Sequence, residues 1–181
     1  MTELTVLECI RGNRTAQKEL YDKYAGSMYV LCQRYFQCRE EAMDALQEGF
    51  IKVFKDLGQF DAAKGSFVQW IRRIFINTCL ELLRKRKMIF SDINEMYDLM
   101  EENVNALDNL GLKDLVSLIQ KLPDGYRTVF NLYVIEGYSH AEIAGMLNIT
   151  ENTSKSQLFK AKNALKKAFD MAFNYYEYES K

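Results

Sequence analysis

Residues 137–156 (GYSHAEIAGMLNITENTSKS) constrain the fold of this chain more than any other segment, because their signals specify a helix, a tight turn and a second helix. Ser139 and Glu142 have the spacing of a capping box, which begins a helix just after the glycine at position 137 has ended the preceding one. Asn148 suits a tight turn because it tolerates the left-handed conformation. Thr150 is then placed to cap the second helix.

The apolar positions of this segment predict that its two helices pack against each other. Ile143 and Leu147 give the first helix a buried face, and the small Ala144 lets the second helix approach closely. The inward stripe expected for the second helix is Ser154, Leu158, Ala161, Leu165 and Ala168. This pattern is typical of a helix-turn-helix, whose second helix enters the DNA major groove, although core helices of any all-α protein can also form such a hairpin.

The charge of the second helix favours nucleic acid. Five lysines lie between positions 150 and 168, namely Lys155, Lys160, Lys162, Lys166 and Lys167, against the single acidic Glu151. Lysines that face a phosphate backbone gain affinity by releasing counterions. A solvated helix face is the alternative interpretation of the same lysines.

The whole-chain charge conceals two opposite blocks. The 181 residues carry a net charge of −1, and 48% of them are hydrophobic, which is enough for one medium domain or two small ones. Residues 71–88 hold six basic side chains against one acidic, whereas residues 91–115 hold seven acidic against one basic. The near-zero net charge of the chain is therefore compatible with a basic DNA-binding face, because an acidic connector offsets the charge of two basic helices.

We expect no enzyme active site, metal or cofactor. The cysteines Cys9, Cys32, Cys38 and Cys79 lack paired spacing and are expected to act as small core hydrophobes, and the only histidine, His140, lies inside the capping box. We find no nucleophile–base set and no glycine-rich phosphate loop. The chain also has no leader and no apolar run of the ~20 residues that cross a bilayer, so we expect a cytoplasmic protein with no membrane insertion of its own.

Apolar periodicity predicts an all-α fold of two small helical domains. Helices are expected over 6–12, around the apolar stripes that begin at Ala16 and Ala42, and over 66–87, with a break at 58–66. A second bundle is expected from about residue 107, with a turn at 122–125. The predicted domains are residues 1–90 and 107–173, joined by an acidic linker at 91–106 and followed by an aromatic tail at 174–181, which either extends the last helix or covers the core.

The helix expected over 66–87 has two different faces. One is apolar and includes Trp70, which we expect in the core. The other is a stripe at helical spacing that consists of Gln69, Arg73, Asn77, Leu80 and Arg84. Amide and guanidinium groups in line can bind phosphates and base edges, although a solvated polar face fits the same stripe.

These segments resemble the two conserved regions of bacterial sigma factors. Residues 41–54 (EAMDALQEGFIKVF), 67–77 (FVQWIRRIFIN) and 82–86 (LLRKR) resemble region 2 of the sigma-70 family, and residues 122–130 (LPDGYRTVF) through 155–162 (KSQLFKAK) resemble region 4. With only a linker between them, the chain is similar to the extracytoplasmic-function (ECF) group, which keeps these two domains. The resemblance implies an alternative sigma factor that binds core RNA polymerase, recognises promoter DNA and helps to melt it.

The resemblance also implies three groups of site residues. Core polymerase would be bound by Asp44, Gln47, Glu48, Phe50 and Ile51, although Phe50 fits a place in the core equally well. The minus-ten element, with a base flipped from the non-template strand, would be bound by Asp61, Lys64, Ser66, Gln69, Arg73, Asn77, Arg84, Lys85 and Arg86. The minus-thirty-five element would be bound by Thr153, Lys155, Ser156, Gln157, Phe159 and Lys160. Two positions depart from the family pattern, because Ser154 stands where valine is usual and Gln157 where arginine is usual.

Two other functions fit parts of the sequence. A stand-alone helix-turn-helix regulator that binds duplex DNA without polymerase would explain residues 137–167 but would leave residues 44–86 as a generic helical domain. A protein that only mimics a sigma domain would lack basic residues on both DNA-facing helices, which this chain has. Two domains on an acidic linker also suit sequestration by an anti-sigma factor, which the family commonly uses.

Overall fold

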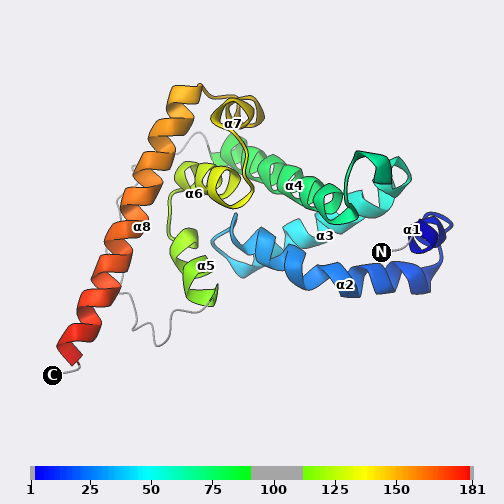
Figure 1. Ribbon diagram of the computed structural model, residues 1–181, viewed down its shortest axis with the longest axis horizontal. Helices are drawn as coiled ribbons and strands as arrows, with labels where there is room; N and C mark the ends of the chain where they lie inside the picture. Colours follow the sequence, from blue (N-terminus) through cyan, green and yellow to red (C-terminus); the bar gives the residue numbers. More distant parts are fainter. Residues whose placement is uncertain (1–2, 91–111, 180–181) are drawn as a thin grey trace. The chain divides into compact units, whose positions relative to one another are not determined.

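The computed structural model describes residues 3–90 and 112–179, which are helical with short connections and contain no strand (Figure 1). The chain divides into two compact units, Met1–Asp92 and Ile93–Lys181, and each is described by itself. The all-α fold predicted from periodicity is confirmed. The acidic linker predicted at 91–106 lies outside the described residues.

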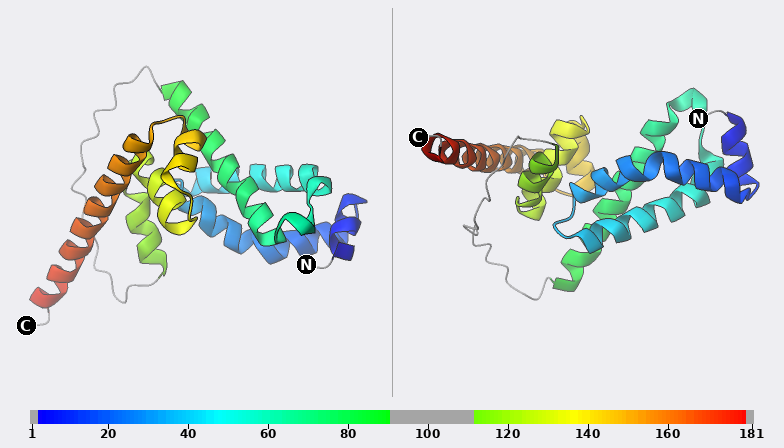
Figure 2. Two further views of the ribbon diagram at one scale, coloured as in Figure 1. Left: turned by 45° about the horizontal axis from the view of Figure 1, so that its top comes forward. Right: turned by 90° about the horizontal axis from the view of Figure 1, so that it is seen from below.

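Unit 1 is a bundle of α1 (Glu3–Ile10), α2 (Arg14–Gln33), α3 (Arg39–Asp56) and α4 (Phe67–Phe90). Helix α2 begins where the side chain of Asn13 accepts hydrogen bonds from the backbone of Thr15 and Ala16, at 3.0 and 3.3 Å. The predicted stripes of α2 and α3 supply much of the core, where Leu20, Met28, Leu46 and Val53 are buried. Both views of Figure 2 show α2, α3 and α4 lying against one another.

Helices α3 and α4 approach each other closely at Gly49. A Cβ atom on Gly49 would lie only 2.7 Å from Cδ1 and Cζ of Phe75, so the glycine is what lets the two helices approach. Phe75 is fully buried and meets the ring of Phe50 edge-on, with centroids 5.2 Å apart. The glycine in the middle of α3 therefore serves close helix packing.

The connection between α3 and α4 is built around aromatic rings. Two 3₁₀ turns, η1 (Leu57–Gln59) and η2 (Ala62–Lys64), replace the predicted break. Phe60 lies 5.2 Å from the ring of Phe67 and 5.6 Å from that of Trp70, measured between centroids. Trp70 is consequently half-buried at the edge of the core, rather than within it as predicted.

Unit 2 places three short helices along the first part of one long helix. Its elements are α5 (Leu112–Gln120), α6 (Asp124–Phe130), the π-helical turn η3 (Asn131–Ile135), α7 (His140–Leu147) and α8 (Glu151–Glu179) (Figures 1 and 2). Pro123 directly precedes α6, as its fixed φ angle favours. Helix α8 includes most of the predicted aromatic tail, so residues 174–179 extend the last helix.

A buried arginine ties α5 to α6. Arg127 is 0% exposed, and its Nη1 donates to the carbonyl oxygens of Gln120 (2.8 Å) and Leu122 (2.9 Å), which α5 leaves without helical partners. Its Nη2 forms an ion pair with Asp124. Every one of these partners lies within eight residues of Arg127, so the guanidinium stabilises the turn itself.

Three of the four cysteines are buried and one is exposed. Cys9, Cys32 and Cys79 are buried, as predicted, whereas Cys38 is exposed because it precedes the first turn of α3 at the surface. A hydrogen bond with Cys32, together with burial, raises the pKa of the Cys79 thiol well above its ordinary value. Cys79 is therefore held as an unreactive thiol in the core.

We expect Gly49→Ala to destabilise unit 1 by about 1–2 kcal/mol, because overpacking against Phe75 outweighs the gain in helix propensity. The matched control is Gly26→Ala in α2, where a Cβ would meet nothing within 4 Å, and it should stabilise by up to about 1 kcal/mol. Urea unfolding followed by the fluorescence of Trp70, the only tryptophan, measures both. Equal shifts of the midpoint in the two variants would contradict the close approach.

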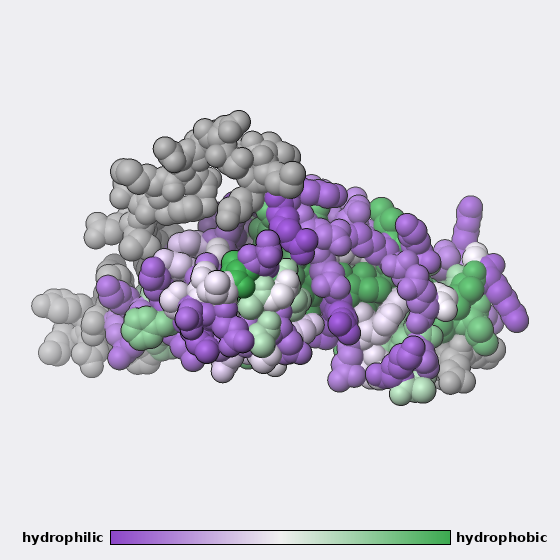
Figure 3. Space-filling model, turned by 90° about the horizontal axis from the view of Figure 1, so that it is seen from above, coloured by the Kyte–Doolittle hydropathy of each residue, from purple (hydrophilic) through white to green (hydrophobic). Residues whose placement is uncertain are grey.

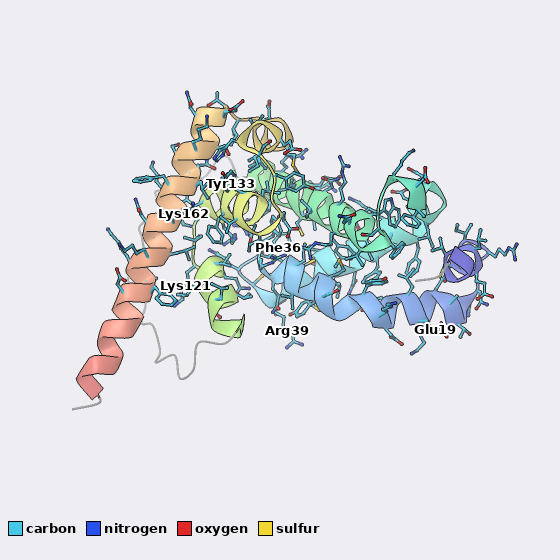
Figure 4. All side chains as sticks on the ribbon, in the orientation of Figure 1. Glu19, Phe36, Arg39, Lys121, Tyr133 and Lys162 are labelled. Carbon is cyan, nitrogen blue, oxygen red and sulfur yellow. The ribbon has the colours of Figure 1, made fainter. Side chains whose placement is uncertain are left out.

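We expect Arg127→Met to destabilise unit 2 by about 3 kcal/mol, because two carbonyl groups and a buried ion pair lose their partner. The exposed Lys121, seen in Figure 4, provides the control, since Lys121→Met should change stability by less than about 0.5 kcal/mol. Amide hydrogen exchange of α6 and α8 reports the loss, with the fluorescence transition of Trp70 in unit 1 as an internal reference. Unchanged protection in Arg127→Met would show that the guanidinium is dispensable.

Candidate nucleic-acid interface

The predicted helix-turn-helix is present, with the caps that the sequence indicated. Ser139 N donates to Glu142 Oε2 at 2.8 Å and Glu142 N donates to Ser139 Oγ at 3.3 Å, which completes the capping box of α7. Asn148 ends α7 in the left-handed conformation, with φ 53° and ψ 50°. Thr150 Oγ1 accepts from the backbone N–H of Thr153 at 3.0 Å and so begins α8.

Helix α8 separates its predicted DNA-facing side chains from its buried ones. Ser154, Leu158 and Ala161 are buried on the inner side of α8, as the stripe predicted, whereas Leu165 and Ala168 of the same stripe are half-buried. The exposed side chains include Lys155, Ser156, Phe159 and Lys160, which we name the α8 face. Phe159 is 66% exposed among lysines and a serine, so its ring is accessible to a partner.

The lysines of the α8 face interact only weakly with the protein. Lys155 Nζ lies 3.5 Å from a carboxylate oxygen of Glu151, and both side chains are more than half exposed, so solvent screens the pair. Lys160 Nζ lies 5.9 Å from the ring centroid of Tyr126 in α6. Neither contact prevents these ammonium groups from binding phosphates.

Two of the residues predicted to contact the minus-thirty-five element have side chains that contact other residues of unit 2. Thr153 Oγ1 lies 2.8 Å from Thr150 Oγ1 within the cap of α8. Gln157 is half-buried, and its amide nitrogen would lie 3.3 Å from a Cβ built on Gly125 of α6. Gln157 therefore packs against α6 in this structure, whereas Lys155 and Lys160 project outward.

Helix α4 of unit 1 carries a second exposed polar stripe. Gln69, Arg73, Asn77, Arg84 and Lys85 are exposed, which agrees with the predicted face. Leu80, which the same spacing assigned to this stripe, is buried because it packs into the core on the border between the two faces of α4. On the surface drawn in Figure 3, hydrophilic side chains predominate and hydrophobic ones emerge in small separate groups.

Arg86 differs from the other basic residues of α4. Its Nη1 lies 3.1 and 3.3 Å from the two carboxylate oxygens of Glu41 in α3, and the pair is about two-thirds buried. Because the guanidinium ties α4 to the start of α3, Arg86 is a structural residue in this state and is not presented to phosphate as predicted.

The loop before α4 is exposed and held by its own side chains. Asp61 Oδ1 accepts from the backbone of Ala63 at 2.9 Å, and Lys64 Nζ lies 3.6 Å from Asp61. Ser66 donates from both its backbone and its hydroxyl to Gln69 Oε1, at 3.2 and 3.1 Å. The loop thus presents polar groups around a cap, and a ligand that binds Ser66 and Gln69 must replace these hydrogen bonds.

The predicted polymerase-binding residues lie on the outer face of α3, with one exception. Asp44, Gln47 and Ile51 are exposed, Glu48 is half-buried and Ile51 is 62% exposed. Phe50 is only 4% exposed and contacts the rings of Tyr21 and Phe75, so it belongs to the core. The remaining four residues form a surface with an apolar side chain beside acidic and amide groups.

Two side chains at this interface were not predicted to belong to it. Tyr126 lies beneath Lys160, and His140 contacts α8 through Ser154, with 2.9 Å between Nδ1 and Oγ. No local pattern could indicate either contact, because both join helices that are separate in sequence.

The described part of the chain contains no cluster of three or more His, Cys, Asp or Glu side chains suited to a metal ion. Among the described helices, none combines the length and apolar character needed to cross a membrane.

Comparisons with known proteins match both units. Residues 20–88 match the family model described as Sigma-70 region 2, and residues 112–165 match the one described as Sigma-70, region 4. The chain is 30% identical over 180 residues to the ECF RNA polymerase sigma factor SigW of Bacillus subtilis, with 92% of this chain and 96% of that relative covered. It is 32% identical over 171 residues to the RNA polymerase sigma-H factor of Pseudomonas aeruginosa, with 87% and 88% covered.

A solved structure shares the fold. The sigma factor RpoE from Bartonella quintana, crystallised with the anti-sigma factor NepR, aligns with a TM-score of 0.55 at 18% identity, covering 84% of this chain and 96% of that one. At this identity the likeness concerns the fold alone.

Proposed function

The chain belongs to the extracytoplasmic-function group of sigma-70-family RNA polymerase sigma factors, and on that premise we propose how its two units bind core RNA polymerase and promoter DNA. The observation that carries the proposal is the presence of two exposed polar and basic helix faces, one on α4 and one on α8, in separate compact units. Each face lies on a helix whose opposite side is buried, so each is held rigidly.

Unit 2 is proposed to bind the minus-thirty-five element. The helix-turn-helix presents the α8 face, with Lys155, Ser156 and Lys160 available for phosphates and base edges and Phe159 for a thymine methyl group. The N-terminus of α8, whose first turn contains Thr153, is a favourable position for a phosphate, although the N–H of Thr153 itself donates to Thr150 Oγ1. Gln157 is assigned a supporting role against Gly125.

Unit 1 is proposed to bind and open the minus-ten element. Arg73, Asn77, Arg84 and Lys85 would follow one strand along α4, since a charged groove tracks a single-stranded backbone. The loop with Asp61, Lys64 and Ser66, together with Gln69, offers donors and acceptors for the edge of an unstacked base. Arg86 is omitted from this surface because Glu41 holds it.

The outer face of α3 is proposed as the site for core polymerase. Ile51 supplies an exposed apolar contact, while Asp44, Gln47 and Glu48 suit a basic partner surface. This face is separate from the polar stripe of α4. Binding of polymerase and binding of DNA can therefore be altered independently.

A stand-alone regulator fits the chain less well, because it leaves the match to region 2 and the polar face of α4 without a role.

We further propose that the chain divides into four functional parts. These are a region 2-like domain at 1–90, an acidic linker at 91–106, a region 4-like domain at 107–173 and an aromatic tail at 174–181. The protein would act in the cytoplasm, on the nucleoid when bound to polymerase. An anti-sigma factor that covers both units is also proposed, supported by the complex of Bartonella quintana RpoE with NepR.

Transcription from fragmented genomic DNA of the source organism tests the function directly. Purified core RNA polymerase with this protein should give transcript starts that core enzyme alone does not give. Those starts should share two spaced upstream elements, which would define the promoter. Specific duplex binding without polymerase, combined with no new starts, would favour the stand-alone regulator.

The division of labour predicts that Lys160→Glu lowers initiation at least about tenfold, or about 1.4 kcal/mol, while core binding stays near normal. The cause is repulsion between the new carboxylate and DNA phosphates. Ile51→Asp should weaken binding to core polymerase, and initiation should fall as a consequence. Lys121→Glu, an exposed charge reversal outside the α8 face, is the control and should leave both activities unchanged. Promoter-specific transcription and affinity for core enzyme are measured in parallel, and equal loss of both in Lys160→Glu would refute the division.

A further inference from the structure

Three side chains link the three elements of the helix-turn-helix region. Tyr133 in η3 stacks on the ring of His140 at the start of α7, with centroids 4.4 Å apart and an interplanar angle of 22°. The Nδ1 atom of His140 lies 2.9 Å from Oγ of Ser154 in α8. Figure 4 labels Tyr133 in the segment that leads into α7. One continuous set of contacts therefore runs from η3 through α7 to α8.

The serine stands in an apolar stripe. Ser154 is 0% exposed, and the other buried residues of this side of α8 are Leu158 and Ala161. A buried hydroxyl needs a hydrogen-bond partner, and within a helix it commonly uses the carbonyl four residues earlier. Here the partner is instead a side chain of the neighbouring helix.

A hydrogen bond constrains helix packing differently from an apolar contact. Apolar contacts are non-directional and tolerate a small rotation or slide of one helix on the other. A hydrogen bond weakens steeply when its distance or angle changes. Ser154 also directly precedes Lys155 and Ser156, so any rotation of α8 that breaks the bond also moves the first residues of the α8 face.

We propose that His140 and Ser154 are positioning residues, which set the rotation of α8 on α7 and thereby the base selectivity of the α8 face. The proposal rests on the proposed binding of DNA by unit 2. Neither residue is proposed to touch DNA. Tyr133 supports them by fixing the plane of the imidazole ring through the stack.

The matched variants for a test are Ser154→Thr and Ser154→Val. Both side chains are β-branched and have the same number of heavy atoms, but only threonine keeps the hydroxyl that can bond His140. Each is made in the native chain and in a His140→Phe background, where the ring can still stack on Tyr133 but cannot accept or donate at Nδ1. Holoenzyme assembled with each variant is assayed on the mapped promoter and on versions with single base changes in the upstream element.

We expect Ser154→Val to lose about tenfold in discrimination between the native and altered upstream elements, and Ser154→Thr to keep most of it. In the His140→Phe background the two variants should be equal. Equal discrimination by threonine and valine in the native background would overturn the proposal. If both added methyl groups prevent folding, as judged by circular dichroism, Ser154→Ala replaces them and should lose discrimination only when His140 is present.

A separate readout distinguishes this inference from the function on which it rests. Absence of promoter-specific starts with the unaltered protein would refute the proposed function itself. Normal starts, combined with equal behaviour of the threonine and valine variants, would refute only the positioning role. Nitrogen chemical shifts of the His140 ring provide the structural check, because they should change in Ser154→Val and not in Ser154→Thr.

Discussion

The packing of unit 2 depends on the buried guanidinium of Arg127. It satisfies the carbonyl groups of Gln120 and Leu122 at the end of α5 and pairs with Asp124 at the start of α6. A buried charge is tolerated only where such partners surround it, so the turn has little freedom to adopt another path. Helix α6 in turn packs along α8, and its Gly125 and Tyr126 lie against Gln157 and Lys160. The orientation of the recognition helix is thus connected, through α6, to a single arginine.

In unit 1, the orientation of α4 is set by close apolar packing and not by a buried charge. The absence of a side chain at Gly49 lets α3 approach the ring of Phe75, and the aromatic rings of Phe50, Phe60, Phe67 and Trp70 fill the remaining space. The ion pairs Lys52–Glu81 (2.7 Å) and Arg86–Glu41 then join the outer edges of α3 and α4. A rigid α4 is what allows Arg73 and Asn77 to present their side chains in a line.

Local patterns predicted the helix-turn-helix well, because its signals act over three or four residues. The capping box of Ser139 and Glu142, the left-handed Asn148 and the cap at Thr150 are all present where they were expected. Predictions failed where the outcome depends on a distant partner. Leu80 is buried although it shares the spacing of the polar stripe, and Arg86 is held by Glu41. Phe50, which fitted either the core or the polymerase-binding face, is core because Tyr21 and Phe75 cover it.

The sequence by itself determined the helical class of the protein, the position of the helix-turn-helix and the two basic faces, since periodicity, capping and charge are properties of neighbouring residues. Its motifs also indicated the sigma-factor family. Only the tertiary structure decided which side chains of each helix remain available to a partner. It turned Gln157 toward Gly125, joined His140 to Ser154 and buried Arg127 among backbone carbonyls. These outcomes depend on which helices meet and at what distance, and no local pattern carries that information.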